Sequence, residues 1–311
     1  SILLRAFLSS RSDYLANEET KNNLTKIIQN HKNFTKNGEI ELEKGLMKLA
    51  LVDMAALVPI LMNVPHKSSY RNHLLLMLLT SATHRELFLD QYHKLLVKCD
   101  MTSLDTMKYF AILPQIIDTE ENADMIALTF GTMVAEIIML IAYAYSNNGT
   151  KEFGKSNIKQ ATENITNCLE KLFTKTQLEK KAKYSVNVND ITSVSDTIKK
   201  IAKIVTTLEV EKIQVLHQRC NVMLQSPNQA VLLVAGILDI HLFAHFIDYK
   251  NSEANDLNKT LSHEIAESFD VSNNLTRRYL ASLMPLEKTS HFNEEDIKKI
   301  FIAMSSSLAE A

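Results

Sequence analysis

Glycine is unusually scarce in this chain. Its 311 residues include six glycines, about 2% of the length, where roughly 7% is usual. Hairpins, nucleotide-binding loops and tight strand-to-helix turns need glycine, because only glycine adopts a positive φ without steric cost. The five prolines are equally few, whereas the helix formers leucine, isoleucine, lysine, glutamate, methionine and alanine are abundant. The composition therefore predicts an all-α protein built from long helices.

Apolar residues recur at helical spacing along almost the whole chain. This pattern predicts about a dozen helices, arranged as a multi-helix bundle or an orthogonal helical array. The clearest loop covers residues 146–157 and contains two of the six glycines. If the protein has two helical lobes, we expect this loop to divide an N-terminal lobe, residues 1–148, from a C-terminal lobe, residues 156–311.

The C-terminal helix has a well-defined start. Asn293 is a capping residue, and Glu294, Glu295 and Asp296 complement the positive end of the helix dipole. An apolar set follows at helical spacing. We expect its members to face inward: Ile297, Ile300, Phe301 and Met304.

Two segments are almost uniformly apolar and are long enough to span a bilayer. They are Met125 to Tyr145, which contains the single charge of Glu136, and Asn228 to Ile247, which is interrupted by Asp239, His241 and His245. A charge at mid-span costs roughly 2.5–3.5 kcal/mol on insertion scales, and neither segment has basic flanks. We therefore predict two buried central helices rather than membrane contact.

Charge is distributed in blocks along the sequence, although the net charge is only −2. Residues 1–98 carry 13 basic and 9 acidic residues, and residues 151–203 carry 11 and 6. Residues 99–150 carry 1 and 7, and residues 239–311 carry 7 and 12. Blocks of opposite sign favour association of a basic surface with an acidic one, so we predict a protein partner, most simply another copy of the chain.

The basic blocks also suggest an alternative, which is a groove that binds RNA or another polyanion. The candidate contacts are Lys67, Arg71, Arg85, Lys175, Lys180, Lys181, Lys183 and Tyr184. The same residues are equally compatible with solvated helix faces and a polar loop. The near-neutral overall charge is unlike that of a dedicated DNA-binding domain, whereas a nucleoprotein that encloses RNA needs only local positive charge.

One set of residues has metal-ligand spacing. His241 and His245 lie one helical turn apart, and Asp248 follows three residues later on the same side. Two imidazoles and a carboxylate are ligands for zinc or iron. The glutamate of an H-E-x-x-H motif is absent, and a histidine on an apolar helix is more often a core residue. His217 and Cys220 lie three residues apart on another helix. They too are either metal ligands or, more often for such residues, part of the core.

The sequence contains no phosphate-binding glycine loop and no recognisable nucleophile motif. We therefore predict no cofactor and favour a protein without enzymatic activity. Cys99, Cys168 and Cys220 are widely spaced and form no C-x-x-C pair, and no secretory segment follows Ser1. These features predict an intracellular protein of a reducing compartment, either the cytoplasm or the nucleus.

Three functional hypotheses follow. The leading one is a structural or scaffold protein that acts through self-association or association with a partner. The first alternative is a viral nucleoprotein- or matrix-like protein that binds RNA through local basic patches. It rests on the basic blocks and on a composition rich in Met and Asn and free of Trp. The second alternative is an all-α metalloenzyme that uses His241, His245 and Asp248.

Overall fold

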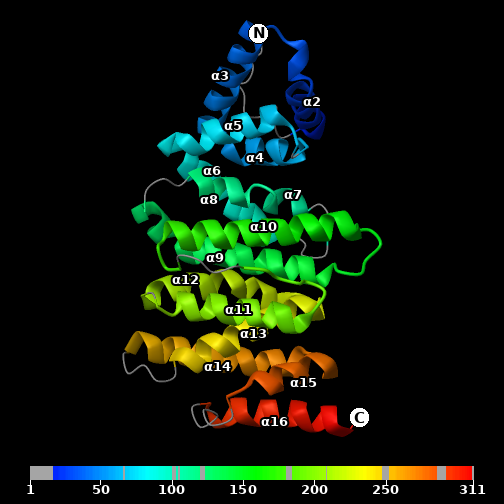
Figure 1. Cartoon of the computed structure of the whole chain (residues 1–311), viewed down its shortest axis with the longest axis vertical. Helices are drawn as coiled ribbons and strands as arrows, with labels where there is room; N and C mark the ends of the chain where they lie inside the picture. The colour runs from blue at the N-terminus through cyan, green and yellow to red at the C-terminus, as the bar shows by residue number, and fades with distance from the viewer. Residues whose placement is uncertain are drawn as a thin grey trace. The chain divides into compact units, whose positions relative to one another are not determined.

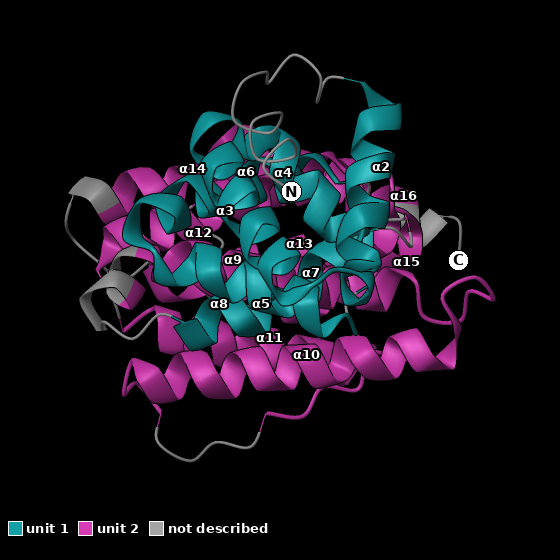
Figure 2. Cartoon of the chain, turned by 90° about the horizontal axis from the view of Figure 1, so that it is seen from above, with its two compact units in different colours: residues 1–100, 105–121 teal, residues 101–104, 122–311 magenta. Residues whose placement is uncertain are grey.

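The all-α prediction is confirmed by a computed structural model of the chain. The structure describes residues 17–65, 67–99, 103, 106–119, 123–179, 184–207, 209–246, 252–285 and 292–309. Within these ranges the regular structure is helical and no strand occurs. The chain divides into two compact units, residues 1–100 with 105–121 and residues 101–104 with 122–311, coloured separately in Figure 2.

Unit 1 is a set of short and medium helices. They are α2 (Glu18–Gln29), α3 (Lys36–Val52), α4 (Met54–Asn63), α5 (Ser69–Thr80), α6 (Ala82–Lys98), α7 (Met107–Phe110) and α8 (Leu113–Thr119), with the 3-10 turn η2 (His31–Asn33). Helix α4 packs against α2, α3 and α6, and α5 packs against α6 and α8. Leu46, Leu75 and Phe88 are among the side chains buried in this core.

Arg71 belongs to the core of unit 1 rather than to its surface. Its side chain on α5 is 1% exposed. The Nε group donates a hydrogen bond to the carbonyl oxygen of Leu61 at 2.9 Å, near the C-terminal end of α4. Since the last carbonyl groups of a helix have no partner within the helix, the guanidinium completes the end of α4. The structure therefore does not place Arg71 on a polyanion-binding surface.

Unit 2 contains the longer helices. They are α9 (Ala123–Ser146), α10 (Gly154–Lys175), α11 (Ile191–Val205), α12 (Val210–Cys220), α13 (Gln229–Phe246), α14 (Ser252–Val271), α15 (Asn274–Leu283) and α16 (Glu294–Ala309), with the 3-10 turn η4 (Asn221–Gln225). Helices α9 and α10 run side by side, as do α13 and α14 (Figure 1). Helix α13 also packs against α9, α11 and α15, so it lies at the centre of the unit.

The two apolar segments are α9 and α13. Each has a stretch that is long and apolar enough to cross a membrane, Thr129–Ser146 and Gln229–Phe246. In the structure 83% of the first stretch and 72% of the second is buried inside the protein. Burial on nearly all sides explains why neither helix has a polar face. Both helices are therefore largely buried within unit 2.

Helix α9 approaches α12 closely at Gly131. A Cβ atom added to this glycine would lie 2.4 Å from the backbone carbonyl oxygen of Lys212 on α12. Real Cβ atoms do not approach a carbonyl oxygen to this distance, so a larger residue would force the two helices apart. The small residue at position 131 thus fixes the spacing between α9 and the helix that carries His217.

The predicted lobe boundary does not coincide with the division between the units. The loop at residues 146–157 lies inside unit 2, where it joins α9 to α10. Its glycines supply the positive φ angles of the turn, 78° at Gly149 and 66° at Gly154. These two helices pack against each other, so the loop is the connection of an antiparallel helical pair.

The prediction for the inner face of α16 is wrong in part. Asp296 and Ala303 are buried, whereas Ile297 and Phe301 point outward and are 44% and 71% exposed. Asp296 is held inward because Asn293 donates to its carboxylate and accepts from its backbone N–H at 2.8 Å, while His263 of α14 contacts it at 3.1 Å. Anchoring of this carboxylate turns the most apolar stripe of α16 away from the unit.

Candidate functional site

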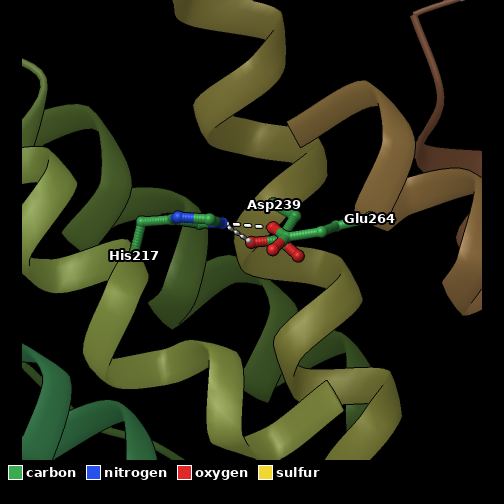
Figure 3. Close-up of side chains that lie close together, drawn as sticks. All are labelled: His217, Asp239 and Glu264. Carbon is green, nitrogen blue, oxygen red and sulfur yellow. Dashed lines mark hydrogen bonds and ion pairs between the residues drawn. The ribbon is translucent and has the colours of Figure 1, made fainter. Parts of the chain in front are cut away.

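Three helices of unit 2 bring together a histidine and two carboxylates in the interior. His217 comes from the end of α12, Asp239 from the middle of α13 and Glu264 from α14 (Figure 3). The Nε2 atom of His217 is hydrogen-bonded to Oε2 of Glu264 and lies 3.9 Å from Oδ1 of Asp239. Ligand-type atoms of all three groups lie within 4.8 Å of one another.

Local sequence explains why each side chain points inward. His217 lies on the buried face of α12, one residue after Leu216 and four after Ile213. Asp239 lies on α13, where every direction around the helix is covered by neighbouring helices. Glu264 lies one residue before the buried Ile265 and retains 14% exposure. Packing of α14 against both α13 and α12 therefore brings the three polar groups together.

The pKa values of Asp239 and His217 are both raised in this cluster. Burial raises the pKa of the Asp239 carboxyl to about 7, and the charge of Glu264 acts in the same direction while His217 opposes it. For His217, burial disfavours the charged imidazolium, but the hydrogen bond to Glu264 and the charge of Asp239 outweigh it and raise the pKa. His217 and Asp239 therefore hold their protons more tightly than the same side chains do in water.

Asp239 is only partly satisfied by its surroundings. Asp239 is 3% exposed, and its Oδ2 atom has no hydrogen-bond partner. A buried polar atom without a partner costs about 1–3 kcal/mol, and more when it is charged. Cys220 lies near the same carboxylate, since burial and then the charge of Asp239 raise the pKa of its thiol. Such an unsatisfied oxygen in an otherwise packed interior needs an explanation.

A pocket lies beside the cluster, on the side of Glu264. It has a volume of about 330 Å³ and is lined by Asn221, Leu224, Gln225, His263, Glu264, Glu267, Ser268 and Val271. Glu264 is thus shared between the buried cluster and the pocket wall. Beside it, Lys299 of α16 forms an ion pair with Glu267 of α14.

The sequence-predicted metal set is not assembled among the described residues. His241 and His245 both lie on α13, one turn apart, and Asp248 lies outside the described residues. Burial, followed by the charge of Lys199, lowers the pKa of His241 to about 4, so this imidazole is neutral at physiological pH. His245 packs edge-on against the ring of Phe246 at 5.2 Å. In the part of the chain that is described, these histidines join no group of three metal-ligand residues.

The predicted polyanion contacts come from several different elements of the two units. Lys67 is exposed before α5, Arg85 is half-buried on α6, and Lys175 ends α10. Lys180, Lys181 and Lys183 lie outside the described residues. Tyr184 is 5% exposed, stacks on Phe173 at 5.4 Å and donates a hydrogen bond to Glu179. Its ring is therefore a core contact rather than a platform for a base.

A different group of lysines, outside the predicted polyanion contacts, gathers on α11. Lys199, Lys200 and Lys203 are exposed and line a pocket of about 540 Å³ together with Tyr184, hydroxyl side chains and two aspartates. Lys200 Nζ lies 5.9 Å from the centre of the Tyr184 ring. The spacing of three and four residues on one helix is the signal that predicts a shared face.

The chain matches no protein-family model and no curated protein sequence. Fold and site therefore define its class: an all-α protein with a histidine–carboxylate cluster enclosed by three helices of its larger unit.

Proposed function

We propose that this protein is a non-enzymatic scaffold that associates with further copies of itself through the outer face of α16. We call this surface the α16 face and define it as Ile297, Phe301 and Ile302. The observation that carries the proposal is its exposure, 44%, 71% and 54% respectively on a single helix. Scattered exposed apolar residues are normal, but a contiguous group marks an interaction surface.

The neighbouring helix α15 carries a further exposed apolar residue. Arg277 of α15 contacts the carbonyl oxygen of Ala303 through Nη1 at 3.5 Å, so the start of α15 lies beside the last turns of α16. Leu275, two residues before Arg277, is 79% exposed. Within the α16 face, an exposed aromatic side chain with aliphatic ones on the same helix is typical of a protein–protein interface.

Charge supports a second copy as the occupant. The α16 face belongs to the acidic block at residues 239–311, with 12 acidic and 7 basic residues. The same chain carries a complementary basic block at residues 1–98, with 13 basic and 9 acidic residues. Contact between the acidic block of one copy and the basic block of the next is heterologous, and such contacts build rings or filaments.

Substitution of Phe301 tests the proposal. We expect Phe301→Asp to weaken self-association by at least about 30-fold, because loss of a central aromatic residue costs about 2 kcal/mol or more. Since Phe301 is exposed in the single chain, the melting temperature should not fall. Light scattering coupled to size-exclusion chromatography measures the mass of the associated species.

Asn255→Asp is the matched control for Phe301→Asp. It adds the same charge at an exposed position of α14 within the same acidic block, without removing an apolar side chain. It should associate as the wild type does. Equal masses for the wild type and Phe301→Asp over the full concentration range would contradict the assignment of the α16 face.

The lysines of α11 favour polyanion binding as a second candidate function. Replacement of Lys199, Lys200 and Lys203 by Gln should weaken binding to labelled single-stranded RNA and reduce the slope of log affinity against log salt by about 2, at roughly 0.7 per phosphate contact. Fluorescence anisotropy measures both. The control replaces three exposed lysines of the same basic block, Lys151, Lys155 and Lys159, by Gln. Identical slopes for the two triple variants would reject the α11 site.

A further inference from the structure

We propose that His217, Asp239 and Glu264 bind a divalent transition-metal ion of the zinc class. This site is separate from the α16 face and from the lysines of α11. It uses none of the residues that the spacing of His241, His245 and Asp248 suggests. The proposal rests on ligand chemistry, on the separations of the ligand atoms and on an unsatisfied buried oxygen.

The ligand set selects the class of ion. One imidazole nitrogen and two carboxylates are ligands for zinc and for related first-row ions. Calcium and magnesium prefer shells made only of oxygen, with six or more ligands. Three protein ligands leave at least one coordination position for water or for a further group. The thiol of Cys220, one turn from His217 on α12, is buried close to the same carboxylate.

The three groups need little movement to surround an ion. In a tetrahedral zinc site with bonds of about 2.1 Å, ligand atoms lie about 3.4 Å apart. His217 Nε2 and Asp239 Oδ1 are 3.9 Å apart, and ligand atoms of the whole set lie within 4.8 Å of one another. If the side chains of His217 and Glu264 move about 1 Å further apart, which takes a small rotamer adjustment, the distance between their ligand atoms becomes that of a zinc site.

Asp239 Oδ2 is the independent observation that points to a ligand. It is buried without a hydrogen-bond partner, on a carboxylate directed into the cluster (Figure 3). Two carboxylates and one imidazole in a packed interior need a cation or shared protons to balance their charge. A divalent ion neutralises both carboxylates and gives the orphaned oxygen a partner.

The pocket beside the cluster is the approach from solvent that the proposal assigns to the ion. Glu264 forms part of the wall of this pocket of about 330 Å³ and is the most exposed of the three ligands, at 14%. Of the three ligands, Glu264 is the one that lines the pocket. An entry path of this kind is required of a genuine metal site.

Zinc titration of the full chain tests the inference. After dialysis against a chelator, the wild-type protein should bind one Zn²⁺ per chain in calorimetric titration and retain it through gel filtration, as measured by elemental analysis. Its melting temperature should rise with Zn²⁺ concentration. Asp239→Asn keeps the shape of the side chain but removes a charged ligand, and should weaken binding at least tenfold.

Glu267→Gln is the matched control for Asp239→Asn. It removes a carboxylate from the same pocket but outside the cluster, and should bind Zn²⁺ as the wild type does. If Asp239→Asn does not fold, Glu264→Gln replaces the more exposed carboxylate and serves in its place. Absence of stoichiometric Zn²⁺ from the wild type would overturn the inference. Equal affinity of the wild type and the cluster variant would overturn it as well.

Discussion

At the scale of single residues, Asp239 shows how one buried carboxyl group affects both the candidate site and the stability of the protein. It is the only acidic residue of α13, and its neighbours along the helix are apolar. The sequence marked it as an interruption of a hydrophobic segment and marked His217 by its spacing from Cys220. Neither observation predicted Glu264, because the three residues come from three helices. Only the packing of α12, α13 and α14 brings them within 4.8 Å.

The protonation of Asp239 makes folding depend on pH in the absence of metal. Its pKa is about 7 in the folded protein and about 3.9 when unfolded. Between these values the folded state holds a proton that the unfolded state has lost, so the free energy of unfolding falls as pH rises. The raised pKa of His217 acts in the same direction, since its contribution is lost as pH rises through that pKa.

Asp239→Asn should therefore gain stability relative to the wild type between pH 5 and pH 8, by an amount on the order of 1–4 kcal/mol. Urea unfolding in the presence of a chelator measures the difference at each pH. Because both proteins share all other titrating groups, the difference isolates the cluster. A difference that does not change with pH would show that Asp239 titrates as an ordinary surface carboxyl.

At the scale of helices, the sequence predicted the type of element better than the face it buries. Helices α9 and α13 were recognisable because no polar stripe interrupts them, and burial on all sides requires such a pattern. The inner face of α16 was misassigned, because the anchoring of Asp296 by His263 depends on a residue 33 positions away. Hydrophobic periodicity identifies an apolar stripe but does not decide whether that stripe faces the core or a partner.

Two glycines of the central helices should respond differently to alanine. Gly131→Ala places Cβ 2.4 Å from a backbone oxygen of α12, whereas Gly236→Ala places it 3.0 Å from methyl groups of Leu280, which can rotate away. We expect Gly131→Ala to cost about 1–3 kcal/mol of stability. Gly236→Ala should stay within about 1 kcal/mol of the wild type, because helix propensity offsets the contact. Denaturant unfolding measures both, and an equal loss would refute the close α9–α12 approach.

At the scale of the whole molecule, the sequence predicted a helical protein with a hydrophobic centre. It did not predict the division into units, which falls near residues 100–122 rather than at the glycine-containing loop at residues 146–157. A loop with turn residues forms equally well inside a helical pair and between domains, so local composition does not distinguish the two cases. Likewise, the charge blocks predict surfaces of opposite charge. Which apolar residues are exposed beside those surfaces depends on the folded structure and cannot be read from the sequence.

The central claim, that the chain works as a self-associating scaffold, is tested most directly by sedimentation velocity of the full wild-type protein. Samples span concentrations up to about 0.1 mM, at about 0.05 M and about 0.5 M salt. The proposal predicts species heavier than the 35.2 kDa monomer at low salt, growing with concentration and shrinking when salt screens the opposite charge blocks. A single monomeric species at every concentration in low salt would contradict it.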